Sequence, residues 1–152
     1  MIKKCLLCDK LFEIDNNIQK YCCVSHAYAY RAKIKYLKTK KRLSYISKDF
    51  MIWFTGFWEG EGCLISTNKW YNLTISQKDK GIMQLIQNTF RFGQAKKHSN
   101  SQRNHTWNLY SCGEILALIE SIQPYIKLIH RKKQITKFKN SKRVKGFIKY
   151  VK

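Results

Sequence analysis

Three cysteines and a histidine near the start of the chain have the spacing of a metal site. Cys5 and Cys8 are separated by two residues and Cys22 and His26 by three, with 13 residues between the two pairs. Zinc takes four soft or borderline ligands in a tetrahedron, and two short pairs joined by a loop can supply that geometry. Four protein ligands leave no position for water, so the predicted zinc is structural. Cys23 is an alternative to Cys22, and the alternative to a zinc site is a set of buried thiols beside a surface histidine.

A second group of residues combines two glycines with two carboxylates. Gly56 and Gly60 are four residues apart, which places them on one helix face, where missing side chains let another backbone approach. A glycine inside a helix costs about 1 kcal/mol relative to alanine, so the pair suggests a packing purpose. If two such helices cross there, both copies of Glu61 meet at the base of the pair and need a divalent cation between them. Mg²⁺ held in this way can activate water and stabilise the leaving oxygen of a phosphodiester.

Lys and Arg greatly outnumber Asp and Glu in this chain. The 152 residues include 30 basic and 9 acidic ones, which gives a formal charge of +21. A surface of this kind repels itself and is typical of proteins with a polyanionic partner. The basic stretch 27–48 is interrupted by tyrosines and lacks the clean apolar face of a membrane-binding helix, so nucleic acid fits better than an anionic membrane. A merely soluble basic protein is the alternative.

No segment of the chain is predicted to cross a membrane. The longest apolar run, from Phe50 to Trp58, is much shorter than the roughly 20 residues that a span needs. The first residues lack the sustained apolar stretch of a secretory signal. We therefore expect an intracellular protein, in phage-infected or bacterial cytoplasm or in an organelle, whose six cysteines are reduced.

The hydrophobic pattern predicts an α+β fold with one four-stranded antiparallel sheet. We expect a zinc-binding module over residues 1–30, a basic helix or linker over 31–47, a main domain over 48–140 and a basic tail over 141–152. Ser47 is expected to cap a helix that is apolar on every side through Trp58 and is therefore buried on every side. The other predicted elements are strands over 63–67, 70–76, 93–97 and 106–111, and helices over 82–90, 115–122 and 127–139.

Two segments resemble known families. Phe54–Gly62, Phe-Thr-Gly-Phe-Trp-Glu-Gly-Glu-Gly, resembles the nine-residue LAGLIDADG motif of homing endonucleases in its Gly-Phe-x-Glu-Gly-Glu-Gly variant. The order helix, two strands, helix, two strands, helix matches that family over residues 47–139, with further landmarks at Thr74–Lys78 and Gln123–Tyr125. Lys20-Tyr21-Cys22 resembles the treble-clef-like zinc knuckles at the N-termini of DNA-binding proteins, although their last ligand is often cysteine.

The LAGLIDADG resemblance implies roles for particular residues. The second acid of the motif, Glu61, stands where Asp is more usual and is the implied Mg²⁺ ligand, together with the backbone of Gly60. Glu59 is expected to support the helix ends, or to hold the metal ligand in place without binding the metal itself. Gln77 occupies the place of a polar residue at a strand end, and one basic residue of the last helix is expected near the scissile phosphate. The register leaves three choices for that residue: Arg131, Lys132 and Lys133.

The resemblance also implies an assembly and a partner. The family needs two motifs and this chain has one, which implies a homodimer joined at Gly56 and Gly60 that reads a pseudo-palindromic site in double-stranded DNA. Each sheet would lie in the major groove and present alternate side chains to base edges. For any single one of these side chains, the alternative is a position on a strand face that contacts only solvent. The candidate DNA-binding residues are Asn72, Thr74, Ser76, Lys96, His98, Arg103, Asn108 and Tyr110.

Proteins of this family are encoded by mobile introns, and two other functions are compatible with the sequence. One is a non-catalytic binder on the same scaffold, either an intron maturase with its own intron RNA as partner or a regulator. The other is a zinc-finger DNA-binding protein whose C-terminal part only dimerises. The retained acid pair favours the Mg²⁺-dependent site-specific endonuclease, since a pure binder gains nothing from carboxylates that face phosphates.

Overall fold

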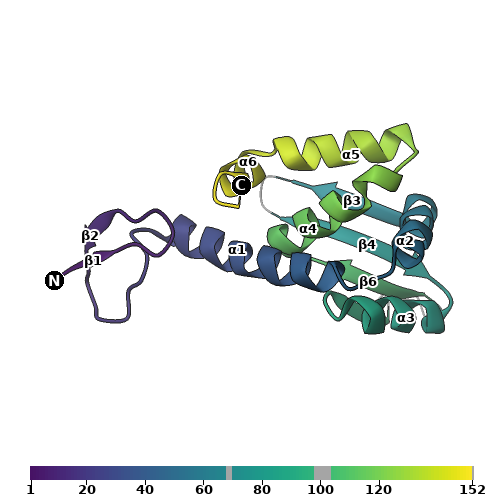
Figure 1. The fold of residues 1–152 in the computed structure, drawn as a ribbon, viewed down its shortest axis with the longest axis horizontal. Helices are drawn as coiled ribbons and strands as arrows, with labels where there is room; N and C mark the ends of the chain where they lie inside the picture. Colours follow the sequence, from purple (N-terminus) through teal and green to yellow (C-terminus); the bar gives the residue numbers. More distant parts are fainter. Residues whose placement is uncertain (68–69, 98–103, 152) are drawn as a thin grey trace.

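A small N-terminal module, a long helix and an α+β domain follow one another along the chain. The computed structural model describes residues 1–67, 70–97 and 104–151 (Figure 1). The module contains β1 (Ile2–Lys4) and β2 (Leu11–Glu13), and α1 (Val24–Leu43) connects it to the domain. The domain consists of α2 (Lys48–Glu61), β3 (Gly62–Ser66), β4 (Tyr71–Gln77), α3 (Lys80–Phe90), β5 (Gln94–Lys97), β6 (His105–Leu109), α4 (Cys112–Ile122), a 3₁₀ turn (Gln123–Tyr125), α5 (Ile129–Asn140) and α6 (Lys142–Ile148).

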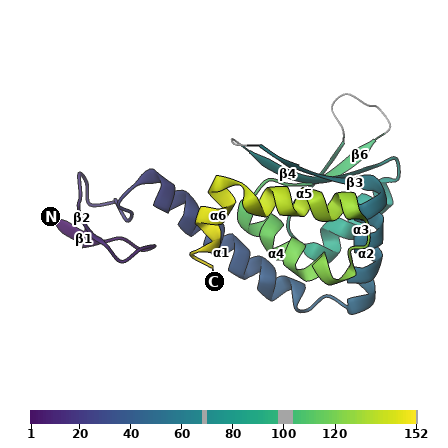
Figure 2. The ribbon, with the colours of Figure 1, turned by 90° about the horizontal axis from the view of Figure 1, so that it is seen from above.

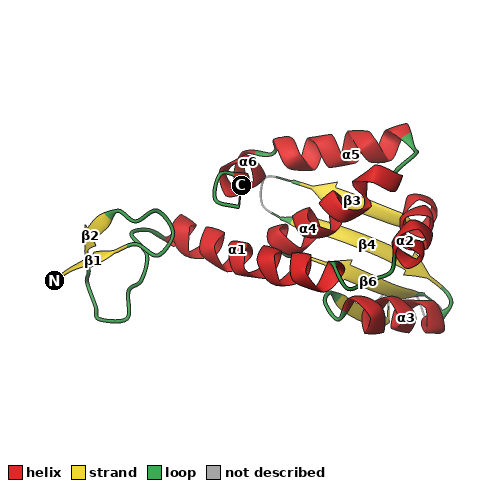
Figure 3. Cartoon of the chain, in the orientation of Figure 1, coloured by secondary structure: helices red, strands yellow, loops and turns green. Residues whose placement is uncertain are grey.

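The predicted four-stranded antiparallel sheet is confirmed, with the strand order β3-β4-β6-β5 (Figure 3). Gly62 pairs with Ile75, Thr74 with Asn108, and Gln77 with His105. The helices of the domain lie on one face of the sheet, and the other face is open (Figure 2). Side chains alternate accordingly, because successive residues of a strand point to opposite faces.

The core lies between the sheet and its helices. Leu73 and Ile75 of β4 are completely buried, and Trp107 of β6 contacts the aromatic rings of α2 and α3. The rings of Phe54 and Phe90 meet edge to face, with centroids 4.6 Å apart. Burial of such large apolar side chains supplies most of the folding free energy, each contributing roughly 1.5–3 kcal/mol. The core therefore fixes where α2 ends relative to the sheet.

The helix predicted after Ser47 forms, but it is not buried on every side. The Ser47 hydroxyl accepts a hydrogen bond from the Phe50 amide at 3.2 Å, as an N-cap does. Met51, Phe54 and Trp58 face the core, whereas the opposite side of α2 is exposed. The reason is that the sheet and α4 cover only one side of this helix within the chain. A helix that is apolar on every side is expected to be buried on every side. The exposed side of α2 is not covered by another helix or strand among the described residues.

Helix α1 is longer than the predicted linker and reaches into the zinc-binding module, because it begins at Val24. It crosses α4 closely: a Cβ atom at Gly113 would overlap the Ala32 carbonyl oxygen. Near this crossing the Tyr36 hydroxyl donates to Glu120 Oε2 at 2.7 Å, and Lys40 lies 3.4 Å from the same carboxylate. These contacts hold the domain half of α1 firmly.

The residues predicted as a basic tail form a helix. Val144 and Phe147 of α6 are buried, and Phe147 packs edge to face on Tyr36 of α1. Apolar residues three or four positions apart lie on one face of a helix, and this face packs against α1. In the sequence, the many charged residues of the segment hide this pattern. In the part of the chain that the structure describes, every helix is too short or too polar to span a bilayer.

Candidate functional site

The two acids of the Glu-Gly-Glu segment point in different directions at the end of α2. Glu59 is only 8% exposed, and its Oε1 accepts hydrogen bonds from the amides of Lys127 at 2.8 Å and Leu128 at 2.6 Å. Leu128 is the residue before the first turn of α5, so the Glu59 carboxylate satisfies amides that this helix leaves unpaired. Glu61 is the last residue of α2 and is exposed. Only Glu61 is therefore placed to bind something outside the chain.

Arg131 is 6% exposed and serves the fold. Its Nε and Nη2 donate to the Glu59 carbonyl oxygen at 3.1 and 2.9 Å, and its guanidinium lies 5.2 Å from the ring centroid of Trp58. It thus ties α5 to the last turn of α2. Lys132 and Lys133, the other two residues of the predicted basic cluster, are exposed on the same helix.

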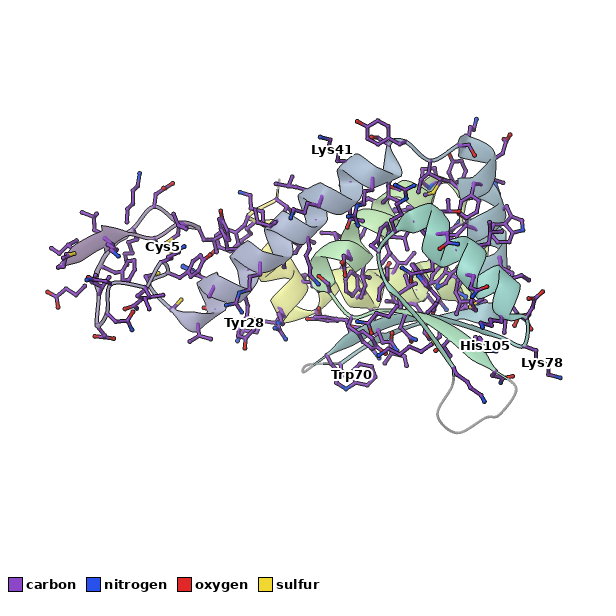
Figure 4. The ribbon with its side chains drawn as sticks, turned by 90° about the horizontal axis from the view of Figure 1, so that it is seen from below. Cys5, Tyr28, Lys41, Trp70, Lys78 and His105 are labelled. Atoms are coloured by element: carbon purple, nitrogen blue, oxygen red, sulfur yellow. The ribbon has the colours of Figure 1, made fainter. Side chains whose placement is uncertain are left out.

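Gln77 lies at the same end of the sheet as Glu61. Gly62, which follows Glu61, pairs with Ile75, and Gln77 is two residues further along β4, beyond the end of β3. The Gln77 side chain is partly exposed, and its Oε1 accepts a hydrogen bond from the Lys78 amide at 2.8 Å. Lys78 and His105 mark this end of the sheet in Figure 4.

The exposed side of α2 is apolar and smooth. Trp53 and Phe57 stack with their rings 5.5 Å apart and nearly parallel. A Cβ atom placed on Gly56 or Gly60 would have no neighbour within 4 Å among the described residues, so both glycines leave open space. We call these four residues, together with the exposed Ile52, the open face of α2. Glu61 lies at the end of this open face.

The open face of the sheet carries the polar side chains that alternation predicts. Asn72, Thr74 and Ser76 of β4 are partly exposed on this face, and Lys96 of β5 is exposed. Asn108 is only 7% exposed, because its Oδ1 accepts from Asn72 Nδ2 at 3.4 Å and its Nδ2 donates to Thr106 Oγ1 at 2.9 Å.

Two features of this face qualify the list predicted from the sequence. Tyr110 is exposed but lies beyond the end of β6, and the predicted His98 and Arg103 are outside the described residues. Gln94 was not predicted: it pairs with Asn108 and is therefore on the open face of the sheet. Only strand register reveals it, and register depends on the partner strand.

The four predicted zinc ligands come together. Cys5, Cys8, Cys22 and His26 each offer one ligand atom, and these atoms lie within 4.8 Å of one another. Cys22 Sγ is 3.0 Å from His26 Nδ1 and 3.8 Å from Cys8 Sγ. Cys23 is exposed and its Sγ lies beside Ser25 Oγ, which decides between the two alternatives for the third ligand in favour of Cys22.

The electrostatics of this cluster suit a cation. Burial raises the pKa of the Cys5 thiol, but hydrogen bonds from the backbone amides of Cys22, Leu7 and Cys8 outweigh it and lower the pKa to about 6. Desolvation and the neighbouring thiols of Cys5 and Cys8 raise the pKa of Cys22 to about 12. Three sulfurs this close cannot all ionise without a cation, and a thiolate-imidazole donor set is that of zinc.

A residue from the far end of the chain completes this cluster. The Tyr150 hydroxyl lies 3.2 Å from His26 Nε2, and the two rings meet edge to face with centroids 5.8 Å apart. A metal-bound imidazole normally has a hydrogen-bond partner at its second nitrogen, which holds the ring in one orientation. Nothing in the sequence around Tyr150 marks this role, since 124 residues separate it from His26.

No protein-family model and no curated protein sequence matches the chain. Among solved structures, the chain is similar to the group I intron-encoded homing endonuclease I-CeuI, solved with DNA (16% identity, TM-score 0.52, 83% of this chain and 76% of that one). It is also similar to the LAGLIDADG meganuclease I-CpaMI bound to uncleaved DNA (17%, 0.52, 67% and 40%). A third similar structure is I-CvuI with DNA and Mg²⁺ (18%, 0.50, 62% and 67%). The predicted fold is confirmed: the chain has the LAGLIDADG homing-endonuclease fold.

Proposed function

We propose that this chain, which has the LAGLIDADG fold, is a site-specific double-strand DNA endonuclease that acts as a homodimer with Mg²⁺. The observation that carries the proposal is the division of labour between the two acids. Glu59 is buried and hydrogen-bonded within the chain. Glu61 is exposed at the end of an apolar helix face that has open space at both glycines. The Glu61 carboxylate makes no hydrogen bond or ion pair with the other described residues.

The open face of α2 supports the homodimer. The exposed Trp53 and the partly buried Phe57 leave apolar surface of α2 in contact with water, and covering it would supply roughly 25 cal/mol per Å². A second copy of α2 crossing at Gly56 and Gly60 would cover these rings. The interface would then be self-complementary, with a two-fold axis between the helices. The same crossing places the two copies of Glu61 side by side at the end of both helices.

The donors at this place fit Mg²⁺, a hard cation that prefers carboxylate and carbonyl oxygen. Glu61 of each protomer and the backbone carbonyl of Gly60 would hold it. When bound, the ion supplies an activated water and stabilises the leaving oxygen of the phosphodiester. Gln77, at the same end of the sheet, would orient the attacking water, and Lys132 or Lys133 would neutralise charge on the phosphate. Arg131 has no part in this chemistry because its guanidinium is committed to the Glu59 carbonyl.

The open face of the sheet is the proposed DNA-reading surface, and the formal charge of +21 supports a nucleic-acid partner. Asn72, Thr74, Ser76 and Lys96 present donors and acceptors to the major groove. Asn108 would act indirectly, by holding the Asn72 amide. The Cys5-Cys8-Cys22-His26 cluster would hold a structural zinc ion that stabilises the N-terminal module.

The test is cleavage of a plasmid library that carries a randomised insert, in the presence of Mg²⁺. We expect the wild-type protein to linearise a subset of plasmids that shares a roughly palindromic sequence. Glu61→Gln should lower the cleavage rate by about 10²–10³-fold, a magnitude typical of losing a group that stabilises the transition state. It should still bind the selected DNA when Ca²⁺ replaces Mg²⁺.

Glu13→Gln is the matched control, because it removes the same charge from an exposed glutamate of the N-terminal module. It should cleave like the wild type. Cleavage by Glu61→Gln at the wild-type rate would remove Glu61 from the proposed site. Binding without any cleavage by the wild type would favour a non-catalytic nucleic-acid binder on this scaffold.

A further inference from the structure

A groove of about 860 Å³ lies between α1, α6 and the end of the sheet that is furthest from Glu61. Its cations come from two segments: Arg31 and Lys35 from α1, and Lys142, Arg143 and Lys149 from α6 and the residue that follows it. None of the described residues that line it is acidic, although Lys35 is paired with the Glu114 carboxylate of α4 at 3.7 Å. The groove is thus a concentration of positive charge outside the LAGLIDADG-like segment.

Exposed aromatic side chains lie among these cations. Tyr28 of α1, Trp70 before β4 and Tyr110 after β6 are 55%, 49% and 53% exposed. The guanidinium of Arg143 lies 5.7 Å from the ring centroid of Tyr28. Tyrosine hydroxyls are frequent donors to phosphate oxygens in protein–DNA interfaces, and flat rings can pack on sugars. The lining therefore offers both charge and contact area to a sugar-phosphate chain.

The groove continues the open face of the sheet. Trp70 precedes Asn72 by two residues and Tyr110 follows Asn108 by two, so both continue the alternation of the open face. Tyr28 lies on the same side of the molecule as Trp70 in Figure 4. A duplex that lies on the sheet therefore passes over the groove as it leaves the protein on the side away from Glu61.

We propose that this groove binds the sugar-phosphate backbone of the target duplex outside the segment that the sheet reads. The proposal rests on the proposed DNA-binding function of the sheet. The groove is concave, and a backbone ridge of a duplex is convex, so one strand would lie along the groove, with α1 and α6 on one side and the end of the sheet on the other. Its contacts would be to phosphates and would carry no sequence information, but they would fix the position of the duplex on the protein.

Lengths of the elements set the expected footprint. The seven residues of β4 extend over roughly 23 Å, or about 7 base pairs at 3.4 Å each. The part of α1 that lines the groove, from Val24 to Lys35, extends over about 18 Å, which corresponds to roughly 5 further base pairs. In a homodimer the two sheets would cover about 14 base pairs, so a duplex of about 20 base pairs ends near the outer edges of both sheets, and flanks of about 10 base pairs on each side should cover both grooves.

The test measures binding of two duplexes that share one central site, about 20 and about 40 base pairs long, chosen from a randomised pool by binding in Ca²⁺. The wild type should show a steeper salt dependence on the long duplex than on the short one. Arg31→Ala in α1 and Lys149→Ala just after α6 should each reduce that slope by about 1 per protomer on the long duplex and leave the short one unchanged.

Lys41→Ala is the matched control, since Lys41 is an exposed lysine of α1 that lies on the other side of the molecule from Tyr28 and Trp70 (Figure 4). It should bind both duplexes like the wild type, and all variants should unfold at the wild-type temperature. If the binding of the wild type to the long and short duplexes had the same salt dependence, the proposal for the groove would be overturned and the endonuclease proposal would stand. Tighter binding of a single-stranded oligonucleotide to the groove would overturn the proposal for the groove as well. Binding of the selected site by the wild type without any cleavage in Mg²⁺ would instead count against the endonuclease alone.

Discussion

Among single residues, Tyr150 has a role that only the folded chain reveals. His26 Nδ1 faces the sulfurs, and His26 Nε2 lies within hydrogen-bond distance of the Tyr150 hydroxyl, at 3.2 Å. This bond fixes the orientation of the imidazole before a zinc ion arrives, and it links the ligand cluster to the C-terminal end of the chain. Loss of the hydroxyl should therefore weaken the zinc site without removing a ligand.

We expect Tyr150→Phe to lower the affinity for zinc by about 10-fold, the lower end of the range for groups that orient a metal ligand. Competition with a chromophoric chelator measures the affinity directly. Tyr45→Phe removes an equivalent hydroxyl from a ring that is exposed, and it should leave the affinity unchanged. An unchanged affinity in Tyr150→Phe would show that the contact has no orienting role.

The residues of the candidate sites were predictable to different degrees. The ligands Cys5, Cys8 and His26 follow from local spacing, because short-range geometry places such pairs together. The choice between Arg131 and its neighbours depends instead on the Glu59 carbonyl, 72 positions away in the sequence. No local pattern contains that contact, so the sequence left three basic residues open.

At the scale of elements, helix α2 presents two glycines, Gly56 and Gly60, at which an added Cβ atom would contact none of the described residues. Gly56→Ala should therefore not destabilise the protomer, and it should favour the helix by up to about 1 kcal/mol. The added methyl groups would keep two copies of α2 apart and should abolish self-association and cleavage. Thermal unfolding and solution mass measure the two effects on one sample.

Gly113→Ala is a useful contrast to this variant, since a Cβ atom there would overlap the Ala32 carbonyl and should lower the unfolding temperature. A Gly56→Ala protein that still dimerises and cleaves would contradict a crossing at that glycine. Equal loss of stability in both variants would show that Gly56 is packed against something in the protomer.

Elements within the domain were predictable where the pattern and the packing agree. Both hairpins and the helices Lys80–Phe90 and Cys112–Ile122 lie close to their predicted positions, because the alternation and helical spacing of their apolar residues mark the elements that pack in the core. Helix α2 is buried on one side only within its own chain, because an apolar sequence indicates a need for partners without saying which chain supplies them. Helix α6 was missed because Val144 and Phe147 are few apolar positions among many lysines.

At the scale of the whole molecule, the domain has a hydrophobic core of its own and the N-terminal module does not. The hydrophobic core cluster of the described residues begins at Tyr36, and before it only Cys5 is a buried apolar residue. The N-terminal module therefore lacks a core of its own and depends on its ligand cluster, while the domain does not.

Removal of zinc by a chelator should consequently unfold residues 1–23 and leave the domain folded. Limited proteolysis should then cut within the module, and the main unfolding transition should keep its temperature. Cys22→Ser should reproduce this pattern without a chelator, whereas Cys23→Ser, the matched control at the neighbouring exposed thiol, should behave like the wild type. A single shared transition that moves on chelation would show that the two parts depend on each other for stability.

The length of helix α1 sets the distance and the direction of the N-terminal module relative to the domain. It runs without interruption from the ligand His26 to Leu43, and its domain half is clamped against α4. Each residue of an α-helix advances about 1.5 Å and turns about 100°. The azimuth of the outer module around the α1 axis is therefore tied to the number of residues between His26 and the clamp. A change of length by two whole turns would move the module along that axis and keep its heading, whereas a half-turn would swing it to the opposite side.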